Sequence, residues 1–290
     1  MLPRKHLVIP DTQCTPDTPT DHLRWIGNYI VEKQPDCIIH LGDFADMEAL
    51  SGYNVGKIQA EGTRYKKDII ASRIAMHELL APLEAYNEKR RLYKEKQYRP
   101  EMHLTLGNHE NRITRYVESN PSMLGFMSVD DLEYESFGWT VHDFLKVVEI
   151  DGVAYSHYFY NPLSGRPYGG ESIETRLKNL GFSFVQGHQQ IYKVGTRCLN
   201  NGRRIRGLIQ GSCYLHDEIY RGPQGNNEMR LIFMLHEVAD GDYMLMEVSL
   251  DYLCRKYEGV RLWEFMKKKY PDLFRQSTWM RKQREMELAA

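Results

Sequence analysis

The amino-acid sequence predicts an α/β fold, and three patterns in its 290 residues support that prediction. Short apolar runs recur along the first two thirds of the chain, and each ends in glycine or a polar residue. Runs of this length are typical of strands that are buried on both faces. A helical pattern separates the first two runs, and a β-rich stretch over residues 143–250 predicts a second, mixed sheet. With 42% hydrophobic residues, the chain is long enough for one large domain or two small ones.

The expected elements follow one another in a regular order. A strand over residues 6–11, a helix over 21–33 and a strand over 37–43 form a βαβ unit, and Pro35 marks the end of the helix. Further strands are expected over 102–108, 153–157 and 182–188, and further helices from residue 108 to 119 and over 171–180. The second sheet is expected to use residues 145–150, 192–198, 204–210, 230–238 and 243–249.

Two segments are basic although the whole chain is nearly neutral. The chain carries 38 Lys and Arg against 39 Asp and Glu, a net charge of −1. Residues 63–99 form a long helical pattern with ten basic and five acidic side chains, and residues 255–290 repeat that balance. We expect a helical insertion at 63–99 and a basic helical C-terminal extension at 251–290, after one domain over 1–250. Such segments are commonly solvated helix faces, and nucleic acid is the partner they would otherwise bind.

Several other classes of protein are excluded by simple features. The five cysteines are odd in number and form no C-x-x-C pair, which argues against a disulfide framework or a thiolate zinc site. No apolar run reaches the length of a signal-peptide core or a membrane span, so we expect a cytoplasmic protein without a membrane partner. The sequence contains no complete P-loop, no G-x-S-x-G elbow and no H-E-x-x-H pair.

Five of the expected strands end in residues that bind metals. These residues are Asp11, Asp43, Asn108, His157 and His188. One polar residue after a strand is usually a turn former, but five in succession are harder to explain in that way. Because ligands of open α/β sheets gather beyond the carboxyl ends of the strands, the pattern predicts a metal site at one edge of the fold.

The motifs around these residues resemble those of the calcineurin-like metallophosphoesterases. The family pattern D-x-H, G-D-x-x-D, G-N-H-E, a lone His and G-H-x-H is matched in order by residues 11–13, 42–46, 107–110, 157 and 187–190. The resemblance implies a four-layer α/β/β/α metallophosphoesterase sandwich, here with a helical insertion. It also implies two divalent metal ions that activate a hydroxide to hydrolyse a phosphate ester.

The resemblance assigns roles to individual residues. Asp43 would bridge the two ions, because a carboxylate between two cations neutralises charge and holds them roughly 3.5–4 Å apart. Asn108, His157 and His188 would complete one metal site, site B. His109 would act as the general acid toward the leaving oxygen, or contact the phosphate, and Asp46 would orient its ring.

The other metal site, site A, departs from the family. Its ligands would be Asp11, Gln13 and Gln190, where glutamine stands at both positions that are histidine in the family. An amide oxygen is a harder and weaker ligand than imidazole, which favours manganese or magnesium over zinc or iron. We therefore expect Mn²⁺ first, with Mg²⁺, Zn²⁺ or Fe as alternatives, weak binding at site A and activity that needs added divalent metal.

Cationic groups that hold the substrate phosphate are expected nearby. Arg112 and Arg115 lie one helical turn apart after the G-N-H-E motif and can share a face. His216 follows a later strand and is a third candidate at the same edge. Residues 161–170, which contain three glycines, are expected to form a mobile loop over the site.

The sequence leaves the substrate open. The two basic segments favour a phosphodiesterase or nuclease, provided that they flank the site. The G-N-H-E-x-R run instead resembles serine/threonine phosphatases, which are phosphomonoesterases, although Met47 and Glu48 replace the Arg-Gly of those enzymes. A non-catalytic nucleic-acid or protein-binding module on the same fold is the alternative from another class.

Overall fold

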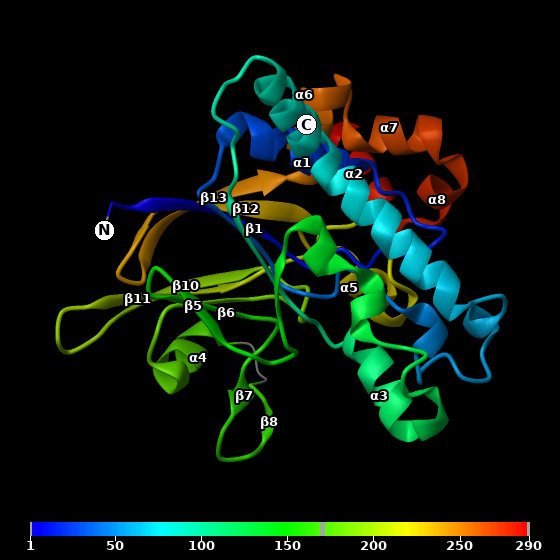
Figure 1. Ribbon diagram of the computed structural model, residues 1–290, viewed down its shortest axis with the longest axis horizontal. Helices are drawn as coiled ribbons and strands as arrows, with labels where there is room; N and C mark the ends of the chain where they lie inside the picture. The colour runs from blue at the N-terminus through cyan, green and yellow to red at the C-terminus, as the bar shows by residue number, and fades with distance from the viewer. Residues whose placement is uncertain (1, 169–171, 289–290) are drawn as a thin grey trace.

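The first of two large sheets has six strands, of which four are parallel. The computed structural model describes residues 2–168 and 172–288. The strand order is β13-β12-β1-β2-β3-β4, in which β1 to β4 are parallel and β12 and β13 are antiparallel (Figure 1). The strands are β1 Arg4–Ile9, β2 Cys37–His40, β3 Glu101–Thr105, β4 Thr140–His142, β12 Leu231–Ala239 and β13 Asp242–Ser249.

The second sheet has five strands in the order β10-β11-β9-β6-β5, and its three central strands are parallel. The strands are β5 Val148–Ile150, β6 Val153–Ser156, β9 Phe184–Gln186, β10 Lys193–Cys198 and β11 Arg204–Ile209. A small hairpin, β7 Tyr160–Asn161 with β8 Arg166–Pro167, occupies most of the expected mobile loop, and residues 169–170 of that loop lie outside the described residues. The two sheets and the helices confirm the predicted mixed α/β class.

Helices lie on the outer sides of both sheets (Figure 1). The α-helices are α1 Asp21–Lys33, α2 Tyr65–Leu92, α3 Asn111–Ser119, α4 Ile173–Leu180, α5 Gly222–Gly225, α6 Leu250–Glu258, α7 Leu262–Lys269, α8 Pro271–Gln276 and α9 Thr278–Leu288. Short 3₁₀ helices cover Glu48–Leu50, Ile58–Ala60, Pro121–Met123, Val129–Leu132, Tyr134–Phe137 and Ile219–Arg221.

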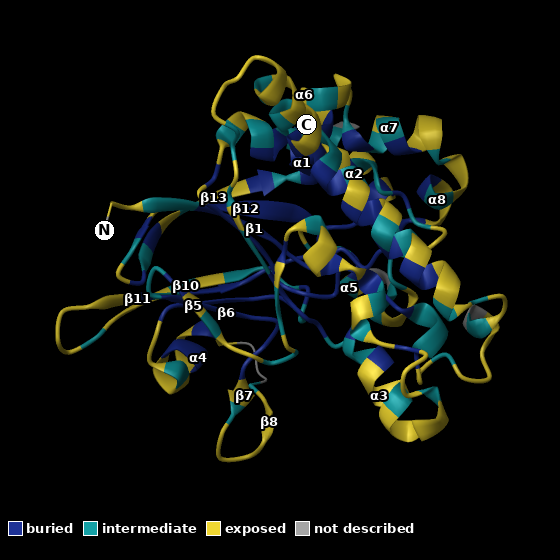
Figure 2. Cartoon of the chain, viewed as in Figure 1, coloured by how far each residue is buried: buried dark blue, intermediate teal, exposed yellow. Residues whose placement is uncertain are grey.

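Three apolar cores hold these layers together. One lies between the six-stranded sheet and the helices and includes Leu7, Ile38 and Met266. The second lies between the sheets and is built mainly from their strands. The third joins the five-stranded sheet to α4, for example through Leu177 and Phe184. Figure 2 shows the strands as mostly buried between more exposed helices and loops. Strands buried on both faces explain why the sequence shows continuous apolar runs.

The segment expected as a helical insertion forms the connection between β2 and β3. Its helix, α2, packs against α1, and Gly27 makes that approach possible. A Cβ at Gly27 would lie 2.3 Å from the carbonyl oxygen of Leu79 and 2.9 Å from the ring of Pro82. A side chain at this position would therefore force the two helices apart.

The C-terminal helices share a core with the rest of the molecule. Leu253, Cys254 and Phe274 belong to the same buried cluster as the first helix. The Trp25 indole N–H donates to Glu258 at 2.8 Å. Among residues 2–168 and 172–288, no helix combines the length and the apolar character that crossing a bilayer requires.

Some expected boundaries differ from the structure. The strand expected over 145–150 begins only at Val148. Leu145 lies in a turn with φ of +70°, a backbone conformation that is incompatible with a β-strand. The helix expected over 171–180 begins at Ile173, where the Ser172 hydroxyl accepts the N–H of Thr175, and residue 171 lies outside the described residues.

Candidate metal centre

The site residues stand at the carboxyl ends of parallel strands from both sheets. β1, β2 and β3 of the first sheet lead to Asp11, Asp43 and Asn108, while β6 and β9 of the second lead to His157 and His188. The structure therefore brings these five residues together at one edge of the fold, as the sequence predicts.

Four of these residues form what we call the histidine half: Asp43, Asn108, His157 and His188. Ligand atoms of Asp43, His157 and His188 lie within 4.8 Å of one another. His157 Nε2 is 3.3 Å from Asp43 Oδ2 and 2.9 Å from Asn108 Oδ1. The residues predicted for site B, together with the bridging carboxylate, are therefore clustered and suitably typed for a divalent ion.

The ring of His157 is fixed by a backbone contact. Its Nδ1–H donates to the carbonyl oxygen of Leu41 at 2.7 Å, which turns Nε2 toward the centre. Burial lowers the pKa of His157, but Asp43 and Asp11 outweigh burial and raise it to about 9. Burial and the positive charge of His157 lower the pKa of His188 to about 4. Without a metal ion, one imidazole is therefore charged and the other neutral at pH 7.

The loop that carries Asp43 is clamped by Glu110. The buried Glu110 carboxylate accepts four backbone N–H groups, those of Asp43 (2.9 Å), Phe44 (2.6 Å), Ala45 (3.0 Å) and Gly107 (2.9 Å). Such charge-assisted bonds are stronger than neutral ones. Glu110 thus ties the β2 and β3 loops together, a role that the sequence motif alone did not assign.

Beside the histidine half, His109 and Asp46 form a hydrogen-bonded pair. His109 Nδ1–H donates to Asp46 Oδ1, while His109 Nε2 is 3.7 Å from Asp43 Oδ2. Burial opposes the charged form, but Asp43 and Asp46 raise the pKa of His109. Burial likewise opposes the Asp46 carboxylate, whose pKa His109 and Arg112 lower. The contact between His109 and Asp46 is the one that the family resemblance implies.

Two glycines permit the close approach of the site loops. A Cβ at Gly107 would lie 2.1 Å from Asp43 Oδ1, and a Cβ at Gly187 would lie 2.4 Å from Asp11 Oδ1. These glycines immediately precede Asn108 and His188 in the sequence. Their place in the G-N and G-H motifs therefore has a steric cause.

Four site residues have a strained backbone. Gln13, Asp43, His188 and Gln190 all have positive φ, between 43° and 64°. This left-handed region costs energy for residues other than glycine, and strained residues cluster at functional sites. The three loops that carry these residues are therefore held in place by their surroundings and not by local preference.

The remaining predicted ligands form the glutamine half: Asp11, Gln13 and Gln190. Asp11 Oδ1 accepts the His188 N–H at 3.1 Å, and burial together with Asp43 raises the pKa of Asp11 to about 6, although His157 acts against them. Gln13 and Gln190 each donate through Nε2 to the Tyr220 hydroxyl, at 3.0 and 3.1 Å. Tyr220 was missed by the sequence reasoning, because no motif connects residue 220 with residues 13 and 190.

The predicted phosphate-binding residues differ in their surroundings. Arg112 Nη1 donates to the Asp46 carbonyl at 2.6 Å and lies 3.3 Å from Asp46 Oδ1, so this guanidinium is already paired. Arg115 is exposed. Burial raises the pKa of Tyr158, and the positive charge of Arg115 acts against that rise, so the two side chains are near each other. The ring of Tyr158 in turn lies 4.5 Å from the ring of His188. Arg115 is therefore at the rim of the histidine half.

His216 is engaged elsewhere. Its Nε2 lies 2.8 Å from Glu218 Oε1, and its ring stacks on Tyr214 at 4.6 Å. The same residue lines a pocket with α8 and the start of α9. His40 and His103, expected as packed residues, are hydrogen-bonded within the first sheet or at its edge, His40 to Gly42 N–H and His103 to His142.

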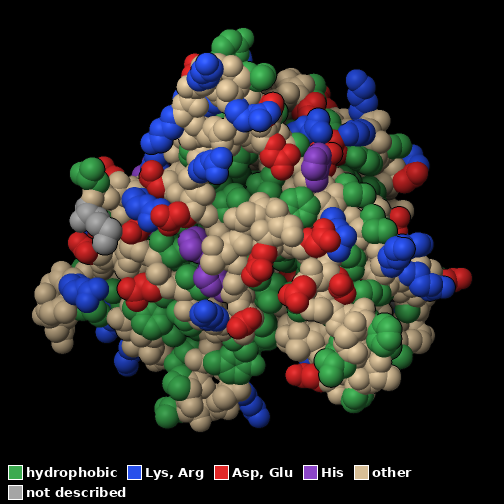
Figure 3. Space-filling model, viewed as in Figure 1, with side chains coloured by type: hydrophobic (Ala, Val, Ile, Leu, Met, Phe, Trp, Pro, Cys, Tyr) green, Lys and Arg blue, Asp and Glu red, His purple; other side chains and the backbone are tan. Residues whose placement is uncertain are grey.

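The two ends of α2 lie at different distances from the metal centre, and the basic run is at the far end. Asp68, in the first turn, accepts the Ala49 N–H at 2.9 Å, and burial and Asp46 raise its pKa to about 6. The basic run at residues 89–91 is in the last turn, about 33 Å further along the axis. It does not flank the site. On the face seen in Figure 3, basic and acidic side chains are interspersed.

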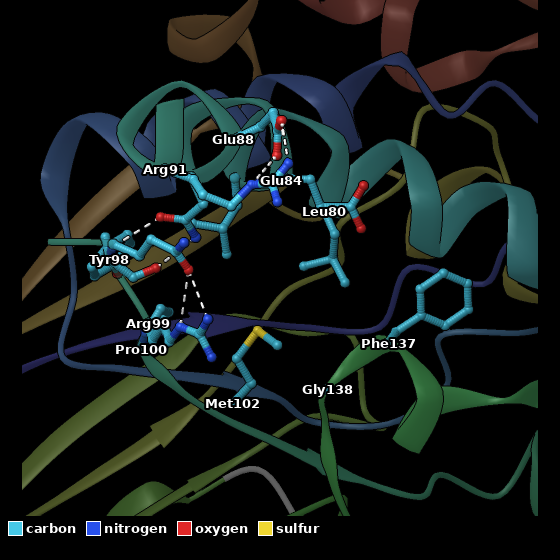
Figure 4. Close-up of a pocket in the computed structure, with 13 residues that line it drawn as sticks. Leu80, Glu84, Glu88, Arg91, Tyr98, Arg99, Pro100, Met102, Phe137 and Gly138 are labelled. Carbon is cyan, nitrogen blue, oxygen red and sulfur yellow. Dashed lines mark hydrogen bonds and ion pairs between the residues drawn. The ribbon is translucent and has the colours of Figure 1, made fainter. Parts of the chain in front are cut away.

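The far end of α2 borders a separate pocket of about 530 Å³ (Figure 4). Its floor includes Leu80 and Met102, and its rim carries Arg91, paired with Glu88 at 2.8 Å, and Arg99, bonded to Gln97 at 2.7 Å. None of the residues predicted for the metal centre lines this pocket.

Comparisons with known proteins show distant similarity to the following proteins. No family model matches the chain. The chain is 25% identical over 193 residues to Gene 54 protein of Mycobacterium phage D29, which is 64% of this chain and 69% of that protein. TT1561 of Thermus thermophilus aligns with 84% of this chain and 99% of its own, at 9% identity and a TM-score of 0.37. Another solved structure aligns with 86% of this chain and 100% of its own, at 14% identity and a TM-score of 0.40.

Proposed function

We propose that the protein is a calcineurin-like metallophosphoesterase that hydrolyses a phosphate ester with the help of bound divalent metal. The observation that carries the proposal is the histidine half, in which Asp43, Asn108, His157 and His188 converge from four different loops. The motif order supports it, as do the two sheets with helices outside them, an arrangement that fits the four-layer sandwich of the family. The domain assignment to residues 1–250 is part of the same proposal.

The donor set of the histidine half fits a transition-metal ion. One carboxylate, one amide oxygen and two imidazoles suit Mn²⁺, Zn²⁺ or Fe, and we keep Mn²⁺ as the first choice with Mg²⁺ as an alternative. A divalent ion held by these residues would polarise the phosphate and lower the pKa of a water, which is the chemistry that phosphate-ester hydrolysis needs. The protein contributes ligand orientation through the Leu41 carbonyl and the Glu110 clamp.

His109 is the residue we assign to proton transfer. Burial acts against the charged imidazole, but Asp43 and Asp46 raise the pKa of His109, which favours the protonated form that a general acid needs. Asp46 accepts Nδ1–H, and Nε2, which lies 3.2 Å from Arg112 Nη2, is the ring nitrogen that we assign to giving a proton to the leaving oxygen. Asp46 is a positioning residue, and Arg112 supports it through the carbonyl and carboxylate contacts.

A diester is the substrate class that the charges favour. A phosphomonoester brings a dianion, which needs more cationic contacts than the monoanion of a diester. Of the three predicted phosphate-binding residues, Arg112 is paired with Asp46 and His216 with Glu218, which leaves Arg115 at the rim. This supports the phosphodiesterase or nuclease over a phosphomonoesterase.

The test compares p-nitrophenyl phosphate with bis(p-nitrophenyl) phosphate in the presence of Mn²⁺. We expect turnover of the diester to exceed that of the monoester and to be lost in Asp43→Asn. Asparagine keeps the Oδ1 acceptor for the His109 N–H and tolerates a positive φ, so the loop should persist. Asp272→Asn, on the exposed surface, is the matched control. Binding of Mn²⁺ without turnover of either ester would favour the non-catalytic module.

Nucleic acid is the natural diester to examine next. Residues 89–91 are distant from the centre along α2, so their neutralisation should leave the hydrolysis of the small diester unchanged. If they bind a nucleic-acid backbone, the same variant should weaken salt-dependent DNA binding. Unchanged DNA binding would identify this run as a solvated surface.

A further inference from the structure

The segment 218–222 covers the glutamine half with the side chains of Tyr220 and Arg221. Gln13 Nε2 and Gln190 Nε2 both donate to the Tyr220 hydroxyl oxygen, at 3.0 and 3.1 Å. Tyr220 is 65% exposed as a residue, yet its hydroxyl reaches the two amides, so the ring spans from the surface to the centre. The two glutamines are thereby joined through one oxygen atom.

The oxygen of Gln190 is fully used by other donors. It accepts the Tyr214 hydroxyl at 2.9 Å and Arg221 Nη1 at 2.8 Å, and Arg221 also donates to the Gln190 carbonyl at 2.9 Å. An amide oxygen has two lone pairs, and both are occupied here. Gln190 therefore has no acceptor left for a cation, and a permanently charged guanidinium stands where a ligand bond would form.

The fit of a metal ion to the glutamine half can be judged atom by atom. Asp11 Oδ2 and Gln13 Oε1 are buried and accept no hydrogen bond from the described residues. These two oxygens suit a water or a weakly held cation. Gln190, however, is turned away, and Arg221 repels a second positive charge at this position. The four-ligand set implied by the family is thus incomplete.

We propose that the centre takes one divalent ion, in the histidine half, and that a closing network of Gln13, Gln190, Tyr214, Tyr220 and Arg221 replaces the second ion. The network fixes the glutamine half through hydrogen bonds, two of them from the Arg221 guanidinium, and so brings one permanent positive charge. It also explains how Gln13 and Gln190 are held at φ of 43° and 52° without a metal bond. This inference rests on the proposed function, because it assumes that the histidine half binds an ion.

The test counts Mn²⁺ ions bound by the metal-stripped full chain, by calorimetric titration and by the electron paramagnetic resonance of free Mn²⁺. We expect one ion per chain. Two ions of comparable affinity would overturn the inference and leave the proposed function standing. No bound ion would overturn both.

Variants of the network test its role independently of the wild-type count. Arg221→Gln removes the positive charge and should allow a second Mn²⁺ to bind, so that the count rises above one per chain. Gln13→His combined with Gln190→His and Tyr220→Phe restores two imidazoles and frees them from the hydroxyl, and should raise the count to two. The exposed substitutions Arg203→Gln and Tyr53→Phe are the matched controls and should leave one ion. If both network variants fold and still bind one ion, as the controls do, the closing network is not what excludes the second.

Discussion

The two halves of the centre stand on equivalent strand ends but are stabilised by different physics. In the histidine half, charged and titratable groups face one another, and the pKa of His157 is raised to about 9 while that of His188 is lowered to about 4. In the glutamine half, two neutral amides share one hydroxyl, and only Asp11 titrates. An imidazole can be protonated, so metal binding by the histidine half depends on pH and on nearby charges. An amide does not titrate, so hydrogen bonds set the positions of the two glutamines. The comparison predicts that the halves respond differently to the same kind of change.

The largest effect is expected when one half is made to resemble the other. His157→Gln places a glutamine in the histidine half and removes the nitrogen that lies 2.9 Å from Asn108 and 3.3 Å from Asp43. We expect Mn²⁺ affinity to fall by roughly 100-fold or more, since even residues that only orient a ligand contribute 10- to 100-fold. Calorimetric titration measures it.

His142→Gln is the matched control for this substitution. His142 is partly exposed on β4 and stacks on His103, outside the centre. It should leave Mn²⁺ affinity unchanged. Equal affinities in His157→Gln and the wild type would mean that the histidine half is not the metal site.

Glu110→Ala tests the clamp beneath the histidine half. The substitution leaves four buried backbone N–H groups without an acceptor, including those of Asp43 and Gly107. We expect the free energy of unfolding to fall by roughly 3–5 kcal/mol, as for a broken buried charge contact. Urea unfolding measures this loss, with the exposed Glu118→Ala as control. A change below about 1 kcal/mol would show that water replaces the carboxylate at no great cost.

Asp46→Asn tests the charge beside the histidine half through the pH profile. Asp43 and Asp46 raise the pKa of His109, so the acid form persists as pH rises and activity is lost only when pH passes that pKa. Removing the Asp46 charge lowers the pKa, and the alkaline limb should move to lower pH, with a 10- to 100-fold loss of kcat at high pH. The exposed Asp130→Asn should leave the limb in place. An unmoved limb in Asp46→Asn would remove His109 from the role of acid.

Sequence patterns sufficed for the fold class and for the histidine half, for identifiable reasons. Buried parallel strands produce continuous apolar runs, and Gly107 and Gly187 are sterically required beside Asp43 and Asp11, so the motifs carry the geometry locally. The closing network was not foreseeable, because Tyr220 reaches residues 13 and 190 only through the tertiary fold. The pairing of Arg112 with Asp46 was hidden for the same reason.

The pH dependence of metal binding sharpens the contrast further. Between pH 6 and pH 9, His157 is protonated without metal and His188 is neutral, so binding an ion must displace one proton. Mn²⁺ affinity should rise about tenfold per pH unit in this window and level off above about pH 9. Titrations in buffers of different ionisation enthalpy count the protons released. A second proton appearing below about pH 6, where Asp11 is also protonated, would mean that the glutamine half takes part in binding.

The smallest expected effect comes from Tyr214→Phe, which removes one donor from the glutamine half. The phenylalanine ring keeps the stacking on His216 and the contact with Arg230, and Arg221 still donates to Gln190 Oε1. What is lost is the hydrogen bond to Gln190 and the one with the Ser212 side chain. We expect the free energy of unfolding to fall by about 0.5–1.5 kcal/mol and Mn²⁺ binding to stay as in the wild type. Urea unfolding and calorimetry measure the two quantities, with Tyr53→Phe as the exposed control. A folded Tyr214→Phe protein with weakened Mn²⁺ binding would contradict the division, because a hydrogen bond among neutral groups of the glutamine half would then be setting the affinity of the histidine half.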